Sequence, residues 1–182
     1  MRKYWIINGV FLVLLLSACK DKQKEGYLTS IAEMQHALDS LELVAEENRI
    51  DTLSLLIQHI KGKTKEFGNL YYPDTVDLKI AGMMNSYKEA RKAMSSNSGN
   101  LAKVRQSIPE VRQKLEDLQH DIEHGVGARD QYQEHIQFEL GKVNQIKTIL
   151  SFYMENKVKY DSVFHVNDQR IQALIVELKN EE

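Results

Sequence analysis

Apolar residues recur every three or four positions over most of the chain, the spacing of a helical face that packs against other helices. The longest run of such positions is Val76, Ile80, Met83, Tyr87, Ala90, Met94, Leu101, Val104, Ile108, Val111, Leu115, Leu118 and Ile122. A second run is Tyr132, Ile136, Val143, Ile146, Leu150, Tyr153, Tyr160, Phe164, Ile171, Leu174 and Leu178. Two shorter runs precede them, and the phase of the spacing changes from one to the other. The first is Tyr27, Ile31, Met34, Leu38, Leu41 and Ala45, and the second is Leu53, Leu56, Ile60 and Phe67. The pattern predicts an all-α fold.

Turn-forming residues divide this pattern into segments. Pro73 disfavours helix at the residue before it, and Asp74 is the predicted N-cap of the helix that follows. The polar stretch 95–100 predicts a loop. Ser107–Glu110 resembles a capping box with a proline in the first turn, which predicts a short turn from residue 101 and then a helix. Gly125 is expected to end that helix in a left-handed conformation.

We therefore predict an elongated antiparallel bundle of coiled-coil-like helical hairpins, with helices at 28–68, 74–95, 101–124 and 128–180. The last helix would be about 75 Å long, more than twice the length of the middle ones. Its far half presents a candidate interaction face of Tyr153, Tyr160, Phe164 and Ile171. Either this face packs on the first helix, a second copy or a partner, or the helix breaks near residue 161 and folds back. A second candidate break lies at 48–51.

Three polar residues, Glu139, Lys157 and Asn167, occupy apolar-face positions of the last helix. Polar groups at such positions usually fix the register of helix pairing, although they also occur at binding sites. We interpret them as structural. The tyrosines at 132, 153 and 160 are interpreted in the same way, as core residues rather than a stripe for a sugar or peptide.

The N-terminal segment has a different pattern. Arg2 and Lys3 precede an apolar run that ends in Leu16-Ser17-Ala18-Cys19, and Cys19 is the only cysteine of the 182-residue chain. The run is too short for a transmembrane helix, which needs about 20 apolar residues. A cleaved signal without lipid would leave a lone thiol in an oxidising compartment. Leu16–Cys19 resembles the lipobox of bacterial lipoproteins.

That resemblance implies cleavage before Cys19 and acylation of its thiol and amino group. Residues 1–18 would then be the signal peptide, 19–26 the lipidated cysteine with a polar tether, and 27–182 a single helical domain. The residue directly after the cysteine is Lys20 and not Asp, which favours the outer membrane. Lys20-Asp21 resembles the surface-export signal of Bacteroidota lipoproteins, whereas Lys22 departs from it. Surface and periplasmic leaflets therefore both remain open.

Net charge and cysteine content narrow the function further. Removal of residues 1–18 changes the net charge from −2 to −4, because it removes two basic residues. The chain has no basic cluster of the kind that binds nucleic acid. With the cysteine acylated, no thiol remains for a disulfide. We expect membrane lipid to be bound through the acylated cysteine, together with a protein partner or a second copy.

One motif suggests chemistry. His120, Glu123 and His124 fit the His-x-x-Glu-His pattern of inverted zinc proteases, with both histidines one turn apart on a helix. Because Ile122 is the only apolar-face residue there, we expect both histidines to point outward, as surface residues. No phosphate loop, nucleophile elbow or cofactor motif is present in the sequence. We expect a structural or protein-binding envelope lipoprotein; the alternatives are a metal-binding or enzymatic lipoprotein, or a sensor or inhibitor of an envelope enzyme.

Overall fold

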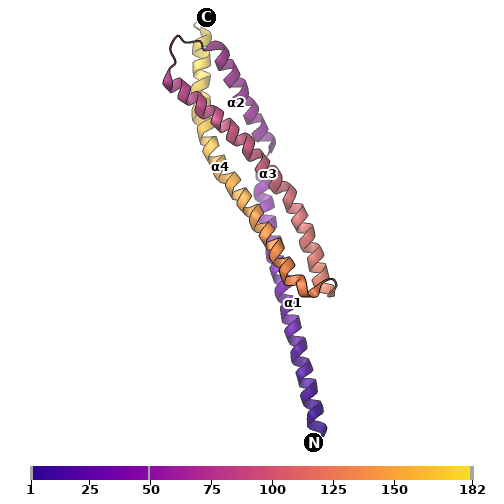
Figure 1. Cartoon of the computed structure of the whole chain (residues 1–182). Coiled ribbons are helices and arrows are strands. Elements are labelled where there is room, and N and C mark those ends of the chain that lie inside the picture. Colours follow the sequence, from indigo (N-terminus) through magenta and orange to yellow (C-terminus); the bar gives the residue numbers. More distant parts are fainter. Residues whose placement is uncertain (1, 49, 181–182) are drawn as a thin grey trace. The chain divides into compact units, whose positions relative to one another are not determined.

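The computed structural model describes the backbone of residues 2–48 and 50–180 and the side chains of residues 22–48 and 52–180. The predicted lipidation site, Cys19, lies outside the described side chains. The elements are α1 (Arg2–Glu47), α2 (Ile50–Leu70), α3 (Leu78–His124), the short 3₁₀ helix η1 (Arg129–Gln131) and α4 (Tyr132–Asn180) (Figure 1). Helices pack against one another, and the described residues include no strand. The all-α class is confirmed.

The predicted division into four helices was wrong. The segments predicted at 74–95 and 101–124 form one continuous helix, so three helical stretches remain, and the first of these is divided into α1 and α2. The candidate break at 48–51 is thus confirmed. Residues 22–26, predicted as a tether, belong to α1.

Helix α3 includes the polar stretch 95–100, which was predicted to be a loop. Asn97, in the middle of that stretch, is buried between the buried residues Met94 and Leu101 and continues the three-four spacing. Burial of this face outweighs the low helix propensity of Ser, Asn and Gly, which costs at most about 1 kcal/mol per residue. Pro109 also lies inside α3 rather than starting a helix. Pro109 is exposed, and because it has no N–H it cannot donate the helix hydrogen bond to the Arg105 carbonyl.

The ends of α3 are set by one carboxylate and two glycines. Asp77, not the predicted Asp74, is the N-cap: its Oδ1 accepts hydrogen bonds from the backbone N–H of Lys79 at 2.7 Å and of Ile80 at 3.3 Å. At the other end Gly125 and Gly127 have φ angles of 63° and 75°. This left-handed backbone suits glycine, so the predicted helix end at Gly125 is confirmed.

Helix α4 is continuous for 49 residues, which rules out one of the two alternatives, the fold-back near Asp161. The candidate interaction face is also corrected. Tyr153, Tyr160, Phe164 and Ile171 are all buried within the chain, each with 9% or less of its surface exposed. Their apolar surface is covered by the protein's own helices, so they form core and leave no surface for a partner.

The described chain forms two compact units. Unit 1 comprises the described residues up to Glu42 together with Ser107–Ile146, and unit 2 comprises Leu43–Gln106 together with the described residues from Lys147 onward. Each unit has its own core: Ile31, Leu38 and Leu115 are fully buried in unit 1, as are Ile60, Leu101 and Ile171 in unit 2. Among the described residues, no helix is both long enough and apolar enough to cross a membrane.

Candidate functional site

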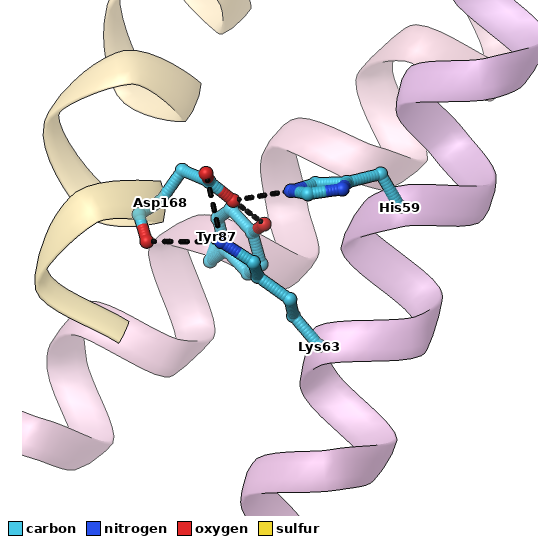
Figure 2. Close-up of polar contacts among 4 residues, drawn as sticks. All are labelled: His59, Lys63, Tyr87 and Asp168. Atoms are coloured by element: carbon cyan, nitrogen blue, oxygen red, sulfur yellow. Dashed lines mark hydrogen bonds and ion pairs between the residues drawn. The ribbon is translucent and has the colours of Figure 1, made fainter. Parts of the chain in front are cut away.

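A cluster of four polar side chains in unit 2 links three helices. His59 and Lys63 lie one turn apart on α2, Tyr87 lies on α3 and Asp168 lies on α4 (Figure 2). The Asp168 carboxylate accepts hydrogen bonds from Lys63 Nζ at 2.9 Å, from the Tyr87 hydroxyl at 2.5 Å and from His59 Nε2 at 2.8 Å. One carboxylate is therefore the common acceptor of three side chains, and we call these residues the Asp168 cluster.

The Asp168 cluster is mostly shielded from solvent. The side chains of Lys63 and Asp168 are 13% and 19% exposed, and only His59 reaches solvent substantially. Burial acts to raise the pKa of Asp168, but hydrogen bonds from Tyr87, Lys63 and His59 outweigh it, so the pKa lies below its usual range. Burial, followed by the hydrogen bond to Asp168 and its charge, raises the pKa of Tyr87. The carboxylate stays ionised and the phenol stays protonated.

This arrangement suits a structural role better than a catalytic one. Three of the roughly four lone-pair positions of the carboxylate are occupied by donors, so Asp168 is poorly placed to accept a substrate proton. Tyr87 is fully buried, and its raised pKa favours the protonated phenol. An aromatic layer lies beside the cluster, because the Phe164 ring is stacked 6.2 Å from Tyr87 and meets His59 edge-on at 5.9 Å.

A groove of about 290 Å³ lies in the same unit. Its apolar lining comes from Leu53, Leu56 and Phe164, and the ion pair of Lys157 Nζ with Asp161 Oδ2, at 3.0 Å, adds charge. Burial raises the pKa of Tyr160, which also lines the groove. The groove therefore presents both apolar side chains and a paired Lys and Asp.

The polar residues expected on the core face of α4 are placed differently from one another. Glu139 and Asn167 are buried, as predicted, whereas Lys157 is partly exposed through its pairing with Asp161. Asn97, which the loop prediction concealed, is buried and its Nδ2 donates to the backbone carbonyl of Tyr153 at 2.8 Å. This bond links α3 to α4 inside unit 2.

The histidine pair lies near the end of α3 in unit 1. Both His120 and His124 are exposed and Ile122 is buried, so the predicted outward orientation is confirmed. The two rings stack with centroids 4.3 Å apart, and His124 Nδ1 lies 2.9 Å from the His120 carbonyl oxygen. Among the described residues, no group of three or more His, Cys, Asp or Glu side chains is arranged to hold a metal.

Sequence reasoning missed the Asp168 cluster. The only sequence signal is the four-residue spacing of His59 and Lys63, which places them on one helical face. Asp168 follows the core position Asn167, and nothing in the spacing shows that it meets two other helices.

In comparisons with known proteins, no family model, no curated protein and no solved structure matches the chain.

Proposed function

We propose that this chain is a lipid-anchored protein of the bacterial cell envelope, with a helical body that binds another envelope protein. The observation that carries the proposal is the placement of the only cysteine, Cys19, directly after a basic start, an apolar run and Leu16-Ser17-Ala18. Such a protein is held by two or three acyl chains, each contributing roughly 0.8 kcal/mol per buried methylene, without spanning the membrane. Under the same proposal, its helices pair in the manner of a coiled coil.

The protein-binding role is supported by the outer face of α4 in unit 2. Phe152, Val158, Val166 and Val176 are exposed there, on the side of the helix opposite the buried Tyr160 and Ile171. The face of a helix turned away from its core is usually polar. These four side chains are spaced six, eight and ten residues apart among exposed polar residues such as Glu155, Ser162 and Gln169. Under the proposal they are separate apolar contact points for the helix of a partner.

Fractionation tests the anchor. Cys19→Ser removes the acyl acceptor, so the variant should leave the membrane fraction and keep its signal peptide or become soluble. Lys22→Ser, three residues further on, is the matched control and should stay with the membrane. If the Cys19→Ser variant still incorporates labelled fatty acid and stays in the membrane fraction, the anchor at Cys19 is refuted.

The binding face is tested by a photo-crosslinking residue at Val158 in cells, with Gln137 on the exposed side of α4 as the control position. We expect one discrete crosslinked species with another envelope protein from position 158 and none from position 137. A product of twice the protein's own mass would instead show a second copy. Identical patterns from both positions would refute the face.

Under this proposal the anchor lies in the outer membrane, because Lys20 and not Asp directly follows Cys19. Protease treatment of intact cells distinguishes its two leaflets, because only a surface-exposed body is digested while the cells remain sealed.

A further inference from the structure

The turn between α3 and α4 is tied to α1 shortly after Cys19. Lys24 Nζ donates a hydrogen bond to the Glu123 carbonyl at 2.7 Å, and the Tyr27 ring meets the Tyr132 ring edge-on at 6.3 Å. Both contacts lie within unit 1. Helix α1 is continuous from before Cys19 through Lys24 and Tyr27. The turn is therefore fixed to α1 five to eight residues beyond the proposed acylation site.

The membrane sets a scale for that spacing. Five helical residues rise about 7.5 Å along the axis. The polar headgroup layer of each leaflet is about 5–8 Å thick. A body anchored at Cys19 thus holds Lys24 and the α3–α4 turn at the outer boundary of the headgroups, and a tilt of α1 brings the turn among them.

Unit 1 has a hollow of about 320 Å³ at this end. It is lined by two cations, Lys24 and Arg129, by the carboxylate of Asp130 and by the rings of Tyr27 and Tyr132. Each cation has donors to spare, because Lys24 uses one N–H on the Glu123 carbonyl and Arg129 uses its Nε–H on the Gly125 carbonyl. Two cations beside one carboxylate complement a group that carries both a phosphate and an ammonium. Tyrosines are also the residues that favour the level of lipid headgroups.

An apolar side chain stands at the tip of the same turn. Val126 is exposed between Gly125 and Gly127, whose left-handed backbone makes the chain reverse around it. Its backbone N–H donates to the Asp121 carbonyl at 2.9 Å, so the tip is held to the end of α3. An apolar side chain fixed beside a charged hollow suits a lipid membrane, which has polar headgroups at its surface and an apolar interior.

We propose that the α3–α4 turn is a second membrane contact, which binds a zwitterionic phosphoethanolamine headgroup of the leaflet that carries the anchor. The phosphate takes the free donors of Lys24 and Arg129, the ammonium takes Asp130, and Val126 enters the interface. This contact rests on the proposed lipid anchor. It would fix the orientation of unit 1 at the membrane, which acyl chains alone do not.

Site-directed spin labelling of the mature lipidated protein tests the contact. Because Cys19 is the only native cysteine and is acylated under the proposal, Val126→Cys provides a single labelling site. Val158→Cys is the matched control, since Val158 is also an exposed valine but lies in unit 2. In phosphatidylethanolamine-containing vesicles, we expect the label at position 126 to lose accessibility to a water-soluble relaxing agent and the label at 158 to keep it.

The outcomes separate the contact from the anchor. A protein that enters the vesicle fraction but leaves both labels equally accessible overturns the contact while the anchor stands. A protein that does not enter the vesicle fraction overturns the anchor, and with it the contact. Equal shielding at position 126 in vesicles of phosphatidylglycerol alone overturns the zwitterionic headgroup.

Removal of the two cations gives a second readout. Lys24→Gln with Arg129→Gln should restore accessibility at position 126 while vesicle association and the far-ultraviolet circular dichroism spectrum stay unchanged. Soluble phosphoethanolamine added to the labelled Val126→Cys protein with both cations intact should also restore accessibility, because it would occupy the hollow. Shielding that persists in both experiments overturns the headgroup site.

Discussion

The two units differ in how charged side chains connect their helices. In unit 2, the mostly shielded Asp168 cluster joins α2, α3 and α4 through one carboxylate. In unit 1, Arg112 on α3 pairs with Asp39 and Glu42 on α1, at 2.7 Å each, and the side chains of these two acids are 63% and 43% exposed. Exposed ion pairs contribute little because water screens them, whereas breaking a buried pair leaves an uncompensated charge. The same chemistry should therefore matter more in unit 2.

The largest expected effect is in the aromatic layer beside the Asp168 cluster. Phe164→Ala removes a buried ring that contacts Tyr87 and His59, and should lower the free energy of unfolding by about 3–5 kcal/mol. Phe152→Ala, on the exposed face of the same helix, should change it by less than about 0.5 kcal/mol. Urea unfolding measures both. Equal losses would show that burial does not separate these two rings.

Asp168 itself should come next. Asp168→Asn leaves Lys63 without its counter-charge and should cost about 2–3 kcal/mol, less than the 3–5 kcal/mol of a fully buried pair because the site is partly hydrated. Arg112→Gln in unit 1 should cost about 1 kcal/mol or less. Thermal unfolding of the two variants checks the ranking, and the reverse order would contradict the contrast between the units.

The effect of Asp168 should also depend on pH. Its pKa is lower in the folded protein than its ordinary value of 3.8, so the stability it contributes is complete above that value and is lost as the pH falls through the folded pKa. The difference in unfolding free energy between the unaltered protein and Asp168→Asn should therefore shrink between roughly pH 5 and pH 3. Urea titrations across that range measure it. A difference that grows in acid would reverse the assigned shift.

The smallest effect is expected at the histidine pair. Because His120 and His124 are both exposed, their replacement by Ala should change the free energy of unfolding by less than about 0.5 kcal/mol. Differential scanning calorimetry of the double variant provides the test. A loss of several degrees in melting temperature, or release of a bound metal, would show that the pair stabilises the fold or binds a metal.

Periodicity alone predicted much of the fold. The buried positions of α3 and α4 largely follow the predicted spacing, because each helix buries one apolar face. Gly125 ends α3 as expected, because glycine readily adopts the left-handed backbone found there. Errors arose where turn propensity was given more weight than spacing. Asn97 continued the apolar spacing through the supposed loop, and its burial could have been inferred from Met94 and Leu101 on either side.

The Asp168 cluster could not have been predicted in the same way. Its members come from three helices, and their meeting depends on how those helices rotate against one another. Spacing along one helix fixes which residues share a face, but not which residue of another helix lies opposite. His59 and Lys63 could be placed on one face of α2, whereas Tyr87 and Asp168 needed the structure.

Mass spectrometry of the protein purified from bacterial membranes tests the lipid anchor most directly. The predicted result is a mature chain that begins at Cys19, lacks residues 1–18 and carries the added mass of a diacylglyceryl group on the cysteine. A chain that retains residues 1–18, or that begins elsewhere and carries a free thiol at Cys19, would contradict it.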